Sequence, residues 1–164
     1  MRIEVARAFV SEGYSLDIDC LIDIGEDQQS VFGNTVASPV HVCGRLYNKA
    51  EVLHLVLDTG YTLTGQCDRC CEDVKISRKA HVETVLVRSK ENEENDELIE
   101  VKDDQFDITD LVTESIMLDV PYKLLCSEDC KGLCPFCGQD LNKKNCGCRK
   151  ASSPFDILKQ EFKS

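Results

Sequence analysis

Eight of the chain's eleven cysteines occur in closely spaced pairs, the pattern of thiolate ligands for a metal ion. One pair lies in TGQCDRC, and the other three lie in the run CSEDCKGLCPFCGQDLNKKNCGC, which spans residues 126–148. Two thiolates a few residues apart can occupy adjacent corners of a tetrahedron around Zn²⁺. Eight ligands would complete two structural zinc sites of four thiolates each. The candidate ligands are Cys67, Cys70, Cys126, Cys130, Cys134, Cys137, Cys146 and Cys148.

The four pairs can be divided between two sites in three ways. Joining the two C-terminal pairs closes a short loop around one ion, so chain entropy favours that division. The other two pairs would then share the second ion, although a cross-braced arrangement stays open. All-thiolate shells leave no position for water, which indicates structural rather than catalytic ions. Iron–sulfur ligation is the lesser alternative, since the paired spacings resemble structural zinc more than ferredoxin runs.

The segment Cys134-Pro135-Phe136-Cys137-Gly138 has the form of a zinc knuckle. Its glycine allows backbone N–H groups to point back at the sulfur atoms. A redox pair at Cys67 and Cys70 is disfavoured, because no helix is predicted after them to lower the thiol pKa.

The remaining cysteines and the histidines are expected to be structural rather than metal ligands. Cys71 directly follows Cys70 and would point away from the metal site, and the others have no second thiol at ligand spacing. The full set is Cys20, His41, Cys43, His54, Cys71 and His81.

The N-terminal sequence MRIEVARAFVSEG lacks the apolar stretch and cleavage site of a signal peptide, so we expect a cytoplasmic protein. In a reducing compartment, many cysteines indicate metal binding more than disulfides. No apolar run approaches the roughly 20 residues that cross a membrane, which argues against a membrane partner. No motif for a small-molecule substrate was found.

The formal charge of −11 is unevenly distributed. Residues 89–110 carry ten acidic residues against two lysines, which points to a basic protein partner. An acidic chain is repelled by nucleic acid at long range, so RNA contact would need a local basic face. The only concentrated positive charge lies beside the cysteine run, and two interpretations of it stay open: contact with RNA, or compensation for thiolate charge. The basic residues are Lys131, Lys143, Lys144, Arg149 and Lys150.

Alternating apolar and polar residues predict an α+β fold with an antiparallel, partly barrel-like sheet core and a few short helices. The expected strands are 16–24, 38–47, 51–66 and 74–88, with a loop over 25–35. Between the sheet and the cysteine run, FDITDLVTESIMLDVP has apolar residues at helical spacing and ends at a proline.

Three segments are expected along the chain. Residues 1–121 form the sheet core, with a polar, acidic loop over 89–105. Residues 122–150 form the cysteine-rich zinc-binding segment packed on that core. Residues 151–164 start with Ser-Ser-Pro and have the pattern of a C-terminal helix.

The succession TGQCDRC, FDITDLVTESIMLDVPYKLLC, CKGLCPFCGQDLNKKNCGC and PFDILKQ resembles the bacterial YceD family of large ribosomal RNA subunit accumulation proteins. The resemblance implies a cytoplasmic factor needed for accumulation or processing of 23S rRNA, without established catalysis. It places the family's cysteine motifs on the eight candidate ligands.

Three functions follow as hypotheses. The first is a non-enzymatic assembly factor whose zinc sites support a surface for pre-ribosomal 23S rRNA, a basic large-subunit ribosomal protein, or both. The second is an acidic, zinc-containing binding module that chaperones a basic ribosomal protein. The third, a nuclease or thiol oxidoreductase, lacks the open metal coordination or reactive thiol that it needs.

Overall fold

The computed structural model describes residues 1–31, 33–50, 52–88 and 98–148, and in them it shows an α+β fold with three short helices. The predicted fold class is confirmed, but the sheet is open rather than closed into a barrel. The helices are α1 (Ala6–Val10), α2 (Glu26–Gln29) and α3 (Thr109–Asp119). The main sheet contains β2 (Ser15–Ile22), β3 (Ser30–Val31), β4 (Asn34–Val36), β5 (Val40–Lys49), β6 (Val52–Gln66), β7 (Asp73–Val87) and β8 (Leu98–Glu100), and a separate ladder joins β1 (Arg2–Glu4) to β9 (Gln105–Asp107).

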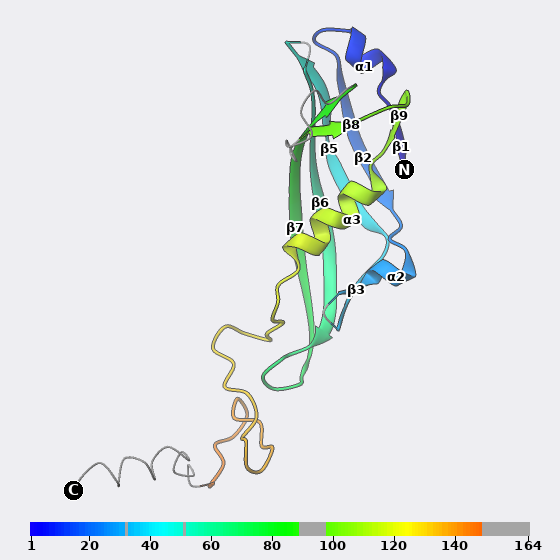
Figure 1. Cartoon of the computed structure of the whole chain (residues 1–164). Helices are drawn as coiled ribbons and strands as arrows, with labels where there is room; N and C mark the ends of the chain where they lie inside the picture. Colours follow the sequence, from blue (N-terminus) through cyan, green and yellow to red (C-terminus); the bar gives the residue numbers. More distant parts are fainter. Residues whose placement is uncertain (32, 51, 89–97, 149–164) are drawn as a thin grey trace, which may run out of the picture.

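The centre of the sheet is the long hairpin of β6 and β7, which runs down the molecule in Figure 1. Its antiparallel register extends from the pair Leu53 and Leu86 to the pair Gln66 and Asp73 at the tip. The alternating sequence buries every second residue of β6 over most of its length, as expected for a strand with one face on the core. The tip of this hairpin carries the first cysteine pair.

The hydrophobic core lies between the sheet and the helices that cover one of its faces. Leu55, Leu57 and Leu63 of β6 are fully buried there. Helix α3 packs on β6 and β7, and α1 packs on β5 and β6 (Figure 1). The side chains of Ile116 in α3 and of Ile108, which directly precedes the helix, are buried in the same core. The predicted helix thus covers a sheet face, as its apolar spacing indicated.

The C-terminal end of α3 is tied to the sheet by a polar cluster. Tyr61 donates its hydroxyl to Asp119 Oδ2 at 2.6 Å, and Arg78 donates to both oxygens of the same carboxylate at 3.0 and 3.1 Å. The Arg78 guanidinium holds the pKa of Asp119 below its usual range. This cluster fixes the direction in which the chain leaves the helix toward Cys126.

The expected loop over 25–35 is wrong in part, because it contains α2, β3 and β4. The last of these, β4, adds to the distal part of β6 through Thr35 and Val36. The buried side chains of Asn34 and Val36 account for this pairing, and such a short alternation is hard to recognise in sequence.

The acidic loop predicted over 89–105 also requires correction. Residues 98–100 form β8, which pairs in parallel with the end of β7, and β9 begins at Gln105. The apolar residues Leu98, Ile99 and Val101 supply the reason, and Val101 is buried. The strongly acidic residues 89–97 and the expected helix over 151–164 lie outside the described residues.

None of the described helices has the length and apolar character needed to span a lipid bilayer.

Candidate metal centres

The structure brings the eight paired cysteines together in two groups of four. The first contains Cys67, Cys70, Cys126 and Cys130, and the second contains Cys134, Cys137, Cys146 and Cys148. In each group all sulfur atoms lie within 4.8 Å of one another, so each could hold a metal ion. The division is the one that chain entropy favours.

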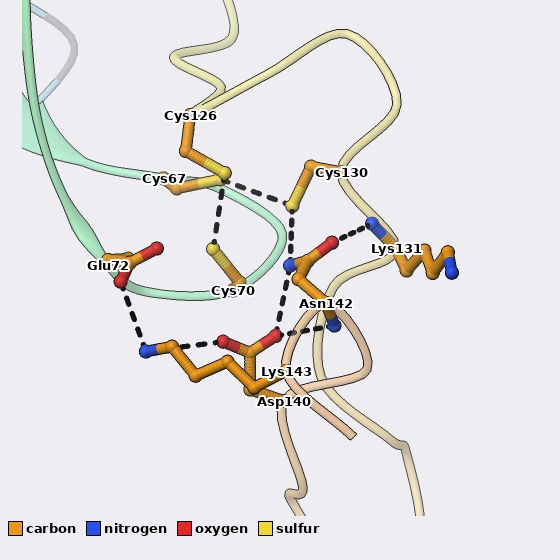
Figure 2. Close-up of polar contacts among 9 residues, drawn as sticks. All are labelled: Cys67, Cys70, Glu72, Cys126, Cys130, Lys131, Asp140, Asn142 and Lys143. Carbon is orange, nitrogen blue, oxygen red and sulfur yellow. Dashed lines mark hydrogen bonds and ion pairs between the residues drawn. The ribbon is translucent and has the colours of Figure 1, made fainter. Parts of the chain in front are cut away.

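The first group joins the tip of the β6–β7 hairpin to the segment that follows α3. Its sulfur atoms converge on one another in Figure 2, with 3.8 Å between Cys67 and Cys130 and 3.6 Å between Cys70 and Cys126. Sulfur atoms bound to a tetrahedral zinc ion at about 2.3 Å would be about 3.8 Å apart. The spacing of the side chains therefore fits a single tetrahedral ion.

Both groups are built on the same backbone turn. The N–H of Cys71 donates to the carbonyl of Cys67 at 2.8 Å, and the N–H of Gly138 donates to the carbonyl of Cys134 at 2.9 Å. The residue that closes each turn has a left-handed conformation, with φ of 59° at Cys71 and 71° at Gly138. Cys71 thus occupies the glycine position of the first knuckle, and its own thiol stays outside the group.

These turns direct backbone N–H groups at one sulfur in each group. Burial raises the pKa of Cys67, but N–H groups of Cys126 and of the knuckle itself outweigh burial and lower that pKa to about 6. The pKa of Cys134 is also lowered to about 6, mainly by the N–H groups of Phe136 and Cys137. Each knuckle therefore stabilises one thiolate at neutral pH.

The neighbouring thiols resist a second ionisation. An N–H of Glu72 favours the thiolate of Cys70, but burial and the thiols of its own group outweigh it and raise the pKa to about 12. The side chain of Cys137, together with burial, raises the pKa of Cys148 to about 12 as well. A divalent cation would offset this repulsion and allow all four sulfur atoms of a group to ionise.

We expect metal affinity to fall as the pH is lowered, because protons compete with the ion for sulfur. Above about pH 6 the protons on Cys70 and Cys148 compete, and below it Cys67 and Cys134 are protonated as well, so the fall becomes steeper. Competition with a chelator between about pH 8 and pH 5.5 measures this dependence. An affinity that does not change over this range would contradict thiolate ligation.

Further contacts hold the first group in place and were missed by sequence reasoning. The carboxylate of Asp68 accepts from the N–H of Leu124 at 2.6 Å, and the N–H of Asp68 donates back to the carbonyl of Leu124 at 2.8 Å. Arg69 donates to the carbonyl of Cys130 at 2.9 Å, and its own carbonyl accepts from Leu133 at 3.0 Å. The two middle residues of the knuckle thus bind the segment that supplies the other two ligands.

The loop of the second group also touches the first. Asn142 donates from Nδ2 to the sulfur of Cys130 at 3.3 Å, and Lys143 forms an ion pair with Glu72 at 3.0 Å (Figure 2). The sequence signal for this arrangement is the Asp-Leu-Asn turn, in which Asp140 accepts from the N–H of Asn142 at 2.8 Å.

The basic residues predicted as contacts do not form one continuous free surface. Lys143 is occupied by Glu72 and also lies 3.6 Å from Asp140. Lys131 and Lys144 are exposed, and neither side chain has an ion pair within the described ranges. The other two, Arg149 and Lys150, lie outside those ranges.

In the part of the chain that the structure describes, no histidine joins either sulfur group. His41 lies 2.8 Å from Asp19, and His81 lies 2.8 Å from Asp58. His54 stacks on Tyr47 with ring centroids 5.0 Å apart. The two remaining cysteines also lie apart from the groups: Cys20 is half-buried against the core and Cys43 is exposed.

Comparison with known proteins identifies a family. A family model described as large ribosomal RNA subunit accumulation protein YceD matches residues 55–160, a stretch that contains all eight paired cysteines. The protein YlbN of Bacillus subtilis is 32% identical over 142 residues, which cover 77% of this chain and 78% of that protein.

Relatives also occur in mycobacteria. The protein Rv2926c of Mycobacterium tuberculosis is 26% identical over 148 residues, and these cover 85% of this chain but only 58% of the relative. The chain therefore matches little more than half of the length of that relative. No solved structure matches.

Proposed function

This chain belongs to the YceD family of large ribosomal RNA subunit accumulation proteins, and we propose from that membership that it is a cytoplasmic, non-enzymatic factor in large-subunit biogenesis. Its role would be the accumulation or processing of 23S rRNA. The observation that carries this proposal is the family match over residues 55–160, which covers most of the long hairpin, α3 and both sulfur groups.

We infer that both groups bind structural Zn²⁺. Four sulfur atoms per group satisfy tetrahedral coordination and leave no position for water or substrate. Such an ion can polarise no substrate and activate no nucleophile, which supports a binding role over catalysis. In this proposal the first ion attaches the cysteine-rich segment to the sheet, and the second folds the segment itself.

We propose pre-ribosomal RNA as the first partner, contacted by the cysteine-rich segment beside the sulfur groups. The support is local charge: Lys131 and Lys144 are exposed and unpaired within the described ranges. Two such lysines add local positive charge to a chain whose formal net charge is −11, so contact would be short-ranged and sensitive to salt.

Affinity capture of the tagged protein at low and high salt, with sequencing of the bound RNA, tests the role and this contact. Wild type is expected to recover 23S precursor. A variant with Lys131→Glu and Lys144→Glu should recover less, and the salt dependence of its RNA affinity should be shallower by about one unit per lysine. The control carries Lys75→Glu and Lys79→Glu, the same charge change at two exposed positions of β7. Equal loss in both variants would remove the proposed contact.

A basic ribosomal protein is the second candidate partner, supported by the ten acidic residues of 89–110. In this case mass spectrometry of the same capture should find one basic large-subunit protein without RNA. Replacing the five acidic residues of 89–97 with Ser and Asn leaves β8 and β9 unchanged and should abolish that complex at low salt. Recovery of neither rRNA nor a ribosomal protein from wild type would contradict the proposed function.

A further inference from the structure

One side chain from the second cysteine group's loop reaches a sulfur atom of the first group. Asn142 lies between Cys137 and Cys146 in sequence, yet its Nδ2 is 3.3 Å from the sulfur of Cys130 (Figure 2). We propose that Asn142 is a positioning residue that couples the two centres, so that each ion binds more tightly when the other is present. This inference rests on the proposed structural ions.

The orientation of the Asn142 amide is fixed by its other contacts. Its Oδ1 accepts from the backbone N–H of Lys131 at 2.8 Å, and only the oxygen atom of an amide can accept. The nitrogen atom must therefore face Asp140 and Cys130, to which it donates at 2.9 and 3.3 Å. A hydrogen bond of this kind stabilises a thiolate more than a thiol, and hence the metal-bound form.

The position of Asn142 depends on the second group because the ligands Cys137 and Cys146 hold the two ends of its loop. Next to Asn142, the N–H of Leu141 donates to the carbonyl of Gly132 at 2.9 Å, which joins the loop to the chain between the two groups. Without the second ion, the sulfur atoms of Cys137 and Cys146 lose the shared ligand bonds that would join the two ends of the loop. The loop would then open and withdraw Asn142 from Cys130.

The effect should be measurable and reciprocal. Loss of an outer contact to a metal ligand commonly costs 10–100-fold in affinity, and we expect about that factor at the first centre. Thermodynamic linkage requires the second centre to lose affinity by the same factor when the first is empty. Cells with limited metal would therefore contain mostly fully loaded or fully empty protein.

The experiment uses the full chain and measures Co²⁺ and Zn²⁺ affinity at each centre by absorption spectroscopy and chelator competition. Cys137→Ser leaves the first centre for titration, and Cys126→Ser leaves the second. Asn142→Asp keeps an oxygen for the N–H of Lys131 but replaces the donor with an anion. It should weaken the first centre about 10–100-fold, and Asn142→Ala should weaken it as well.

The matched control is Asn145→Ala, which removes an exposed asparagine from the same loop; within the described ranges it is Asn142, and not Asn145, that donates a hydrogen bond to a sulfur atom of the first group. It should bind both ions as wild type does. In the Cys137→Ser background, Asn142→Asp should cause little further loss of affinity at the first centre, because the loop has already withdrawn.

Either of two results would overturn the proposal: a first centre of unchanged affinity in Asn142→Asp, or one of unchanged affinity in Cys137→Ser. Circular dichroism of each metal-free and loaded variant identifies any that fail to fold, and Asn142→Ala and Asn142→Asp provide independent readings. Failure of the proposed ions would look different, since wild type would then bind no metal at either group.

Discussion

Replacing Cys67 with serine is expected to remove the ion of the first centre and to destabilise the whole fold. The metal content should fall from two ions per chain to about one, because an all-thiolate site that loses a ligand no longer closes. The free energy of unfolding should fall by about 4 kcal/mol or more, the range associated with loss of a structural metal. Metal analysis and denaturant unfolding of the same preparation measure both effects.

The size of this effect follows from where Cys67 lies. Its side chain is 1% exposed at the tip of the central hairpin, and the ion would join that tip to the segment after α3. The control is Cys71→Gly, which removes the exposed thiol next to the group and suits the left-handed backbone there. It should keep both ions. A Cys67→Ser protein with two ions and wild-type stability would contradict the two-centre interpretation.

The cysteine spacing was sufficient to predict which sulfur atoms come together. Three intervening residues or fewer within each pair keep the two thiols close whatever the fold, and the short loop between the C-terminal pairs made one division favourable. Alternating apolar residues likewise predicted strands over 51–66 and 74–88, and every end of β6 and β7 lies within one residue of those bounds. Both patterns are local in the chain, so the sequence alone was enough to predict these features.

The parts that the sequence did not predict depend on contacts between distant residues. The short strand β8 forms because Leu98 and Ile99 pair with the end of β7, and no pattern within 89–105 indicates that pairing partner. The contact between Asn142 and Cys130 likewise needs two turns to be placed against each other in space. The left-handed conformation at Cys71 was not expected, because glycine is the usual residue there.

The two centres and the hairpin form one connected unit rather than a sheet with an independent appendage. Asp68 at the hairpin tip exchanges two hydrogen bonds with Leu124, which precedes the first ligand of the segment. Asp119 at the end of α3 is bound by Arg78 of β7, so the same two strands fix both ends of the connecting chain. A substitution in the cysteine-rich segment should therefore also lower the stability of the sheet.

Gly132 is the position where this unit is most sensitive to a single added atom. It has φ of 73°, and a Cβ built there would lie 2.8 Å from the backbone carbonyl oxygen of Arg69. Gly132→Ala must pay for a left-handed conformation and also push the hairpin tip away from the segment, a combined cost of about 2–5 kcal/mol. We expect weaker metal binding at both centres, measured by chelator competition, together with a lower unfolding free energy.

Gly138→Ala separates the two causes because its φ of 71° is nearly the same, while a Cβ there meets nothing within 4 Å. The equivalent position of the first knuckle holds Cys71 at φ of 59°, which shows that a side chain fits this turn. Gly138→Ala should therefore cost only about 1–2 kcal/mol and keep both ions. If the two alanine variants lose equal stability and equal metal affinity, backbone strain alone is responsible, and the close approach of Gly132 to Arg69 does not hold the centres together.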